Sequence, residues 1–336
     1  MAKSATFQSN QETRVIIGTE ATFGTKVATG GTRIVMPVTE YNFSEVAAHS
    51  LGVSPFRAGV GGLTQSTEMV RAQRFDRMYE ISLTFMGSPE AIDRICLALF
   101  GDGTNPNELL GSMPATANYS GSTAVPVTIY FENGASTAAS TAISYKTCMC
   151  SSFTISGDIS SNGGMIMGQA TFLTGFAPDN ANISFSGGTE TTLTSQDDIF
   201  NVNDLTTTQI NSGSDEDLVM YSFELTIARE VNRVGFDTAS NGFAPLGYTV
   251  GGYEVTGSMT VKRDAESSAA ITFADTAEPV AAISISTGTF QIEAPKAVID
   301  TASINFDDDG WKTVIPFRCT YDAAATSNPV VQIHTA

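Results

Sequence analysis

The chain has 336 residues, which is enough for one large hydrophobic core or two ordinary ones. Its 35 acidic residues outnumber 17 basic ones, and this net charge of −18 argues against a protein that reads nucleic-acid sequence through a basic face. The same charge does not exclude a surface past which nucleic acid slides without sticking, because like charges repel. Only 15% of the residues are charged, while Gly, Ser, Thr, Ala and Val are abundant, as is typical of a mainly β protein.

No run of about 18 apolar residues is present, so we expect no membrane span and no membrane binding by this chain. The amino terminus is polar and has no apolar stretch of the kind that directs Sec export. The four cysteines fit neither a zinc pattern nor a disulfide framework. We expect Cys96, Cys148, Cys150 and Cys319 to be buried thiols in a reducing compartment.

The first predicted strands are residues 36–43 and 79–85, and the second of these alternates apolar and polar side chains as a half-buried strand does. Between them lies a long connection, residues 50–77, that contains Arg57, Glu68, Arg71, Arg74 and Arg77. A two-strand hairpin cannot use so long a connection, and long ordered loops in compact proteins usually have a function.

A helix is predicted directly after the second strand. Ser88 is a good N-cap, Pro89 a good first residue, and Gly101 follows the last turn as a C-terminal stop. The apolar side chains of the helix, which are spaced to share one face, are those of Ile92, Ile95, Cys96 and Leu99.

A Gly/Ser/Thr/Ala-rich insertion, residues 101–145, comes after the helix and contains a predicted strand near residues 127–131. A hairpin is then predicted from residues 153–159 and 165–173 around Asn162-Gly163, because such a turn favours positive φ at both positions. Residues 178–217 are rich in Asn, Ser, Thr, Gly and Asp and form the predicted connection to the second half of the chain, with a short strand at 183–185.

The same order of elements occurs a second time. Strands are predicted at residues 219–227 and 253–261, then a helix at 265–273 capped by Asp264, then a hairpin from 302–306 and 311–319 around Asp309-Gly310. Both central strands begin Tyr-Glu, at Tyr79 and Tyr253. When the two turns are aligned, the apolar residues of the following strands also fall on matching positions, such as Ala170 on Phe317.

The fold class predicted from this duplication is mainly β, with two tandem β-sandwich or β-barrel domains, each flanked by a short α-helix. The first domain is residues 1–177, with the long loop 50–77 and the insertion 101–145, and the second is residues 178–336.

At this level of pattern the chain resembles the tail tube proteins of long-tailed bacteriophages. The residues that carry the resemblance are 253–261, 222–230, 151–159 and 18–25. The resemblance implies β domains that form rings, with the inner sheets joined into one cylinder, and rings that stack into a DNA-conducting tube. Because the fold is duplicated, it implies three chains in a pseudo-hexameric ring.

The resemblance also implies function, partners and location. The chain would be a structural subunit and no enzyme, made in the bacterial cytoplasm and placed in the tail of the virion. Its partners would be copies of itself and the other tail proteins, namely tape measure, terminator and baseplate. Genomic DNA would pass through an acidic lumen without sequence-specific binding. In the family, a long loop between early strands reaches the neighbouring ring, so the arginines of residues 50–77 would pair with acidic surfaces of an adjacent subunit. The alternative is a solvated loop that balances charge within its own chain.

Catalytic motifs do not occur in the sequence: it holds no nucleophile elbow, phosphate loop or dinucleotide fingerprint. His49 and His334 have no metal-ligand partner at motif spacing, and the consecutive aspartates 307–309 fit turn chemistry better than a calcium loop. We therefore predict no catalytic, metal or cofactor site, and a core position for Trp311, the one tryptophan. The alternative functions are another virion protein, such as a capsid decoration or baseplate component, or a β-sandwich carbohydrate-binding module or hydrolase.

Overall fold

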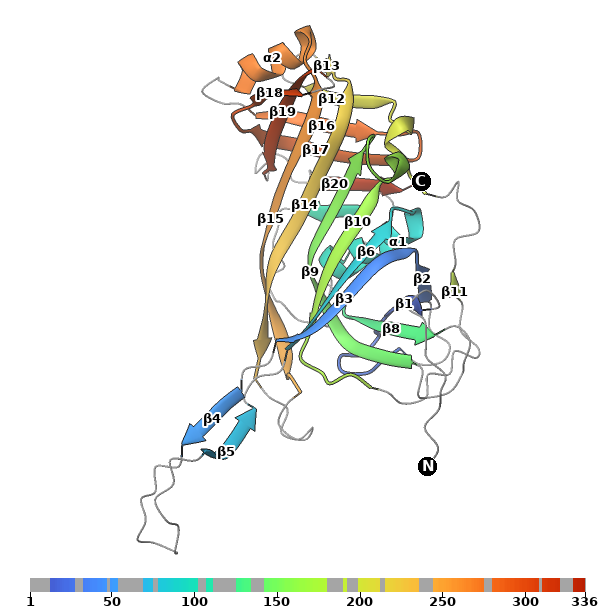
Figure 1. Cartoon of the computed structure of the whole chain (residues 1–336), viewed down its shortest axis with the longest axis vertical. Helices are drawn as coiled ribbons and strands as arrows, with labels where there is room; N and C mark the ends of the chain where they lie inside the picture. Colours follow the sequence, from blue (N-terminus) through green and yellow to red (C-terminus); the bar gives the residue numbers. More distant parts are fainter. Residues whose placement is uncertain are drawn as a thin grey trace, which may run out of the picture.

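The computed structural model describes residues 13–27, 33–46, 49–53, 69–74, 78–101, 107–110, 125–133, 142–179, 190–191, 199–211, 215–235, 244–274, 280–307, 310–320 and 329–335. The protein is mainly β, as predicted, with two α-helices in the described part (Figure 1). In the first half of the chain the elements are β1 (Thr13–Thr19), β2 (Arg33–Met36), β3 (Val38–Val46), β4 (His49–Val53), β5 (Met69–Arg74), β6 (Met78–Met86), α1 (Pro89–Phe100), β7 (Asn107–Leu110), β8 (Val127–Asn133), β9 (Ala142–Asp158) and β10 (Met167–Thr174).

The remaining elements are β11 (Glu190–Thr191), β12 (Thr207–Asn211), β13 (Asp215–Asp217), β14 (Met220–Val234), β15 (Gly247–Lys262), α2 (Ala265–Ala274), β16 (Val280–Ser286), β17 (Phe290–Ile299), β18 (Ser303–Asp307), β19 (Gly310–Cys319) and β20 (Pro329–Thr335). The predicted short strand at residues 183–185 lies outside the described residues.

Both helices form where their caps predict them. The Ser88 hydroxyl accepts a hydrogen bond from the Ala91 amide, and Gly101 takes φ 83° while its amide donates to the Leu97 carbonyl. The four predicted apolar side chains of α1 are all buried. At α2, the Asp264 carboxylate accepts from the Ser267 amide at 3.0 Å, and the Asp264 amide donates to the Ser267 hydroxyl at 2.9 Å, which makes a reciprocal cap.

One antiparallel sheet runs through both halves of the chain. Its strands pair in the order β3–β6–β10–β9–β14–β15–β19–β18, and we call this array the long sheet (Figure 1). The junction between the halves is the pair β9–β14, in which seven residue pairs run from Ser222↔Asp158 to Ala228↔Ser152. The sheet therefore continues without a break from one half to the other.

The pairing pattern occurs twice, which supports the predicted duplication. In the first half, β3–β6–β10–β9 is accompanied by β2–β1–β8–β9, and in the second half β14–β15–β19–β18 is accompanied by β13–β12–β16–β17. β9 has 17 residues and serves both arrays of its half, whereas β17 and β18 divide that role in the second. The boundary at residues 177/178 stays a prediction.

The strand register gives the same alignment of the two halves as the turns do. Leu83 lies opposite Ala170 on β6 and β10, and Gly257 lies opposite Phe317 on β15 and β19. With Tyr79 aligned to Tyr253, Leu83 falls on Gly257, and Ala170 therefore falls on Phe317. We call residues that occupy the same register position in the two halves equivalent.

The two turns differ from the expected hairpins. Asn162 and Gly163 have the predicted positive φ of 50° and 67°, but the last strand pair before them is Ser156↔Met167, so the connection is longer than a tight turn. In the second hairpin Asp307 pairs with Gly310, so Gly310 belongs to β19 and not to the predicted turn, and residues 308–309 lie outside the described residues.

The residues between the first two predicted strands are partly strand. β4 and β5 form their own two-stranded sheet, in which His49 lies opposite Arg74. This small sheet stands apart from the long sheet in Figure 1. The insertion supplies β8, as predicted, and also β7, which pairs with β20 near the end of the chain. The two halves are thus joined by β7–β20 as well as by β9–β14.

The hydrophobic core lies on one side of the long sheet. Alternate side chains of its strands are buried there, such as Ile81 and Leu83 on β6, Phe172 on β10 and Phe153 on β9. The four cysteines are buried free thiols, as predicted. The prediction that Trp311 belongs to the core is wrong: its side chain is 60% exposed and packs edge-on against Phe306.

Candidate assembly surfaces

The side of the long sheet opposite the core carries mostly small hydroxyl side chains, and we call it the hydroxyl face. The register aligns one row across six strands: Thr84, Gln169, Thr154, Thr226, Thr256 and Arg318. Within this row Thr154 and Thr226 share a hydrogen bond of 2.9 Å between their hydroxyls, across the junction of the two halves. The face is polar without being densely charged.

Charged side chains are sparse on this face and acidic ones predominate among the described residues. By register and alternation the acidic members are Glu40, Glu80, Asp158, Glu224, Glu230 and Glu254, and the basic ones are Lys262, Lys312 and Arg318. Lys312 lies over the Tyr221 ring, with its Nζ 4.7 Å from the ring centroid. Two of the three cations therefore lie at one end of the sheet, and the middle of the face has few fixed charges.

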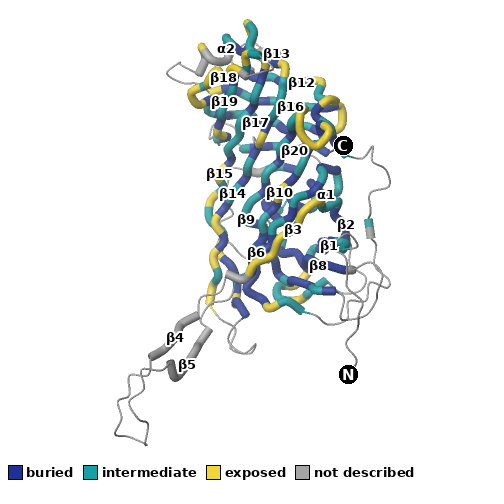
Figure 2. The backbone as a smooth tube through the Cα atoms, in the orientation of Figure 1, coloured by how far each residue is buried: buried dark blue, intermediate teal, exposed yellow. Residues whose placement is uncertain are grey.

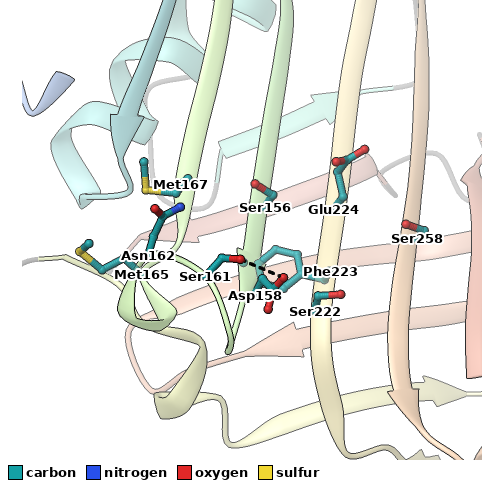
Figure 3. Close-up of a pocket in the computed structure, with 11 residues that line it drawn as sticks. Ser156, Asp158, Ser161, Asn162, Met165, Met167, Ser222, Phe223, Glu224 and Ser258 are labelled. Carbon is teal, nitrogen blue, oxygen red and sulfur yellow. Dashed lines mark hydrogen bonds between the residues drawn. The ribbon is translucent and has the colours of Figure 1, made fainter. Parts of the chain in front are cut away.

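A hollow of about 360 Å³ opens on the hydroxyl face at the junction of the halves (Figure 3). Ser156, Ser222, Glu224 and Ser258 line it from three adjacent strands. Asp158 lies at its edge, where the hydroxyl and amide of Ser160 and the hydroxyl of Ser161 hold the pKa of its carboxyl below the usual range. The described residues that line the hollow include no histidine and no cysteine.

The junction of the halves is well packed on the core side. Leu225 and Ile227 of β14 are 1% and 0% exposed. The buried Arg229 donates from Nε to the Cys150 carbonyl at 2.9 Å and from a terminal nitrogen to the Ala98 carbonyl at 3.3 Å, and Tyr253 donates its hydroxyl to the Leu99 carbonyl at 2.8 Å. Side chains of the second half thus satisfy carbonyls at the C-terminal end of α1 in the first half.

The two outer strands of the long sheet, β3 and β18, are open edges in the described part of the chain. β3 is equivalent to β14 and β18 to the last part of β9, so the two edges correspond to the two sides of the internal junction. Phe43, the equivalent of Ile227, is 46% exposed, and Ile304 and Phe306 on β18 are 48% and 73% exposed. Figure 2 shows exposed residues along β3 and around β18 and β19. Exposed apolar side chains on unpaired strands are the usual sign of a surface meant for a partner.

The residues proposed from sequence as subunit contacts are only partly placed. Arg71 and Arg74 lie on β5, opposite Gly52 and His49 of β4. Arg57, Glu68 and Arg77 lie outside the described residues. The expected pairing of this segment with an acidic partner stays a prediction. The two open edges were not predicted from the sequence. One local signal existed for the β18 edge, where apolar Ile304 and Phe306 alternate with polar Ser303 and Asn305 beside a predicted turn.

The structure also places His334, which was considered as a possible metal ligand from the sequence. His334 lies on β20 with its Nε2 3.7 Å from a Glu293 oxygen. Among the described residues no three His, Cys, Asp or Glu side chains gather as metal ligands, and none of the described helices is long and apolar enough to cross a membrane. No family model matches the chain, and no curated protein sequence matches it.

Proposed function

We propose that this chain is the structural subunit of a bacteriophage tail tube, which acts by assembly and not by catalysis. Copies join edge to edge through the long sheet into a ring, and rings stack into a conduit for DNA in the virion. The observation that carries the proposal is the internal junction, because it shows how one half of the molecule binds the next half. The two open edges are the same two surfaces, without their partners.

The junction between copies can be derived from the equivalences. Inside the chain, Glu224 of β14 lies opposite Ser156 of β9. Glu40 is equivalent to Glu224, because they face the equivalent residues Thr84 and Ser258. Ser303 is likewise equivalent to Ser156, because they face Val314 and Met167. β3 of one copy therefore pairs with β18 of the next, with Glu40 opposite Ser303, the same two residue types as at the internal junction.

Burial supports the same arrangement. Ile227 is fully buried at the internal junction, while its equivalent Phe43 is left 46% exposed at the open edge. Pairing β3 with β18 would bury Phe43 and cover the backbone donors and acceptors of both edges. In a ring formed in this way the long sheet has no free edge, which is the general solution to edge exposure in closed β structures.

The hydroxyl face is the surface that would line the conduit. Hydroxyl and carboxylate side chains in its middle offer no cationic sites to DNA, which carries about one phosphate charge per 1.7 Å of helix axis. A sparse and mainly acidic lining repels the backbone weakly and gives it no sequence-specific contact. Three copies, each with two repeats, would form a pseudo-hexameric ring. The other tail proteins would bind the ends of the stack.

The test is a disulfide across the proposed junction. In a chain with Glu40→Cys and Ser303→Cys, oxidation of assembled protein should join copies and give a closed trimer as the largest species within a ring, measured by mass under non-reducing conditions. The matched control moves one cysteine a strand inward, to Thr84→Cys with Ser303→Cys, because Thr84 lies opposite Glu40. There the Cα atoms lie about 5 Å farther apart and beyond disulfide reach. Protein that stays monomeric at high concentration, or equal cross-linking of the two pairs, would refute the edge pairing, and closed hexamers would refute the trimer.

A further inference from the structure

A short segment before β12 covers the end of the β9–β10 hairpin, and we call residues 199–205 the cover segment. The Phe200 amide donates to the Gly87 carbonyl at 2.9 Å, and the Ile166 amide donates to the Phe200 carbonyl at 2.8 Å. The Asn201 amide group donates to the Gly163 carbonyl at 3.2 Å. The segment belongs to the second half of the chain, and it closes the hairpin of the first.

Side-chain packing under the cover segment is tight. Val202 is 4% exposed, and a Cβ atom added to Gly157 would lie 2.3 Å from a Val202 methyl group. A Cβ atom added to Gly164 would lie 2.7 Å from the Asn201 side-chain oxygen and 2.6 Å from the Asn203 nitrogen. The hairpin has glycines at the two positions where the cover segment lies closest.

Part of the amino terminus resembles the cover segment, with three of eight residues identical. Residues 6–13 read Thr-Phe-Gln-Ser-Asn-Gln-Glu-Thr, and residues 199–206 read Ile-Phe-Asn-Val-Asn-Asp-Leu-Thr. Phe7 matches Phe200 and Asn10 matches Asn203. Both stretches lead into equivalent strands, because β1 pairs with β2 and β8 as β12 pairs with β13 and β16. Residues 1–12 lie outside the described residues, so the likeness is one of sequence and position.

The hairpin equivalent to the covered one is exposed. On the β18–β19 hairpin, Ile304 and Trp311 are equivalent to Gly157 and Gly164, and they are 48% and 60% exposed. The Phe306 and Trp311 rings lie 5.5 Å apart between centroids, edge to face, with Phe306 73% exposed. This aromatic patch is therefore the equivalent of the surface that the cover segment covers in the first half.

We propose that residues 6–12 of one copy cover the β18–β19 hairpin of the adjacent copy, as residues 199–205 cover the β9–β10 hairpin within the chain. The occupant comes from another copy because β1 lies far from β18 and β19 within the molecule (Figure 1). The side-chain sizes are complementary in both places. The larger Val202 lies over Gly157, whereas its smaller equivalent, Ser9, would lie over the larger Ile304. The inference rests on the proposed edge-to-edge assembly and adds a second contact to the same junction.

Trp311 is the only tryptophan of the chain, so its fluorescence reports on this contact directly. On assembly of the full chain, Trp311 emission should shift to shorter wavelength and become less accessible to iodide quenching. A variant that lacks residues 1–12, assembled at the same concentration, should keep the emission and quenching of exposed tryptophan. The matched control is Lys3→Ala, which changes the amino terminus outside the repeated stretch and should behave as the full chain does.

A second measurement covers the case in which the truncated chain fails to assemble. Copies with Ser9→Cys are mixed with copies with Ile304→Cys, assembled and oxidised, and heterodimers should form, whereas Ser9→Cys mixed with Val280→Cys, another exposed apolar position, should not give them. Assembly of the full chain without these heterodimers, or an equal emission shift in the truncated assembly, would overturn the inference and leave edge-to-edge assembly standing. Failure of the full chain to assemble at all would overturn both.

Discussion

The two halves of the molecule share one pattern of strand pairing, yet they differ at the strand that begins each half of the long sheet. β14 is paired on both sides, and its Leu225 and Ile227 are buried. β3 is paired on one side, and its Phe43 is 46% exposed. The difference separates what the fold needs from what a partner needs: equivalent apolar positions serve the core at β14 and remain available at β3.

Each half also has a glycine that lies under an aromatic ring on the neighbouring strand. On β6 and β10 the ring of Phe85 lies over Gly168, whereas on β15 and β19 the ring of Phe317 lies over Gly257. A Cβ atom added to either glycine would lie very close to a ring carbon, at 2.4 Å for Gly168 and 2.3 Å for Gly257. The two contacts are not at equivalent register positions, because Gly257 is equivalent to Leu83. The halves therefore use the same kind of contact at different places in the core.

The largest loss of stability should come from shortening a buried side chain at the internal junction. Ile227→Ala should lower the free energy of unfolding by about 2–5 kcal/mol, because it leaves a cavity at a fully buried position. The measurement is urea unfolding of the unassembled chain. Phe43→Ala is the matched change at the open edge, and it should cost less in the same state, about 1–2 kcal/mol, while weakening assembly. Its ring is half exposed but still packs against Tyr41, Phe131 and Tyr145. Equal losses of stability in the two variants would contradict the comparison.

Removal of the contact between Arg229 and α1 should cause the next largest loss of stability. Arg229→Met keeps much of the side-chain volume but removes donors to the Cys150 and Ala98 carbonyls, so we expect a loss of about 1.5–3 kcal/mol in urea unfolding. Glu230→Met changes the exposed neighbour and serves as the control. A loss for Arg229→Met no greater than that of the control would show that α1 does not depend on this contact.

Substitution of the two glycines that lie under aromatic rings should have an intermediate effect on stability. Gly257→Ala and Gly168→Ala should each destabilise the chain by about 1–3 kcal/mol, because the new methyl group meets an aromatic ring that must move. Gly288→Ala is the control, since a Cβ atom there meets nothing within 4 Å. Thermal and urea unfolding measure the three variants side by side. An effect in one half but not in the other would mean that only one of the two contacts supports the fold.

The smallest effect concerns the hydroxyl face. Thr226→Val removes the hydrogen bond to Thr154 across the junction and should cost about 0.5–1.5 kcal/mol. Thr256→Val makes the same change in shape one strand further along the same row and is the control. If the two substitutions change the urea midpoint alike, the bond across the junction adds nothing to stability.

Local signals in the sequence predicted much of the fold. α1 could be placed to the residue because Ser88, Pro89 and Gly101 act on their own helix ends. β6 could be recognised from alternation, because its period decides which side chains face the core. The alignment of Ala170 with Phe317 could be found from two turns, and the strand register reproduces it.

Features that depend on contacts between distant parts of the chain could not be predicted from local sequence. Alternation in β19 says that Trp311 shares a face with other residues, but not that the neighbouring strand ends there and leaves the ring exposed. β7 has four residues, too few for a period, and its pairing with β20 joins positions more than 200 residues apart. The β9–β14 junction likewise depends on which edges meet, so the candidate surfaces needed the structure.

The junction built into the chain has a consequence for how assembly proceeds. Because repeats arrive in fused pairs, any closed ring contains an even number of them. In the proposed ring, half of the junctions would form when the chain folds, at the high effective concentration that covalent linkage provides, and without loss of translational freedom. Only the remaining half would depend on encounters between copies. The onset of polymerisation would then depend on the junction between copies, β3 with β18, while the junction within each copy is already formed.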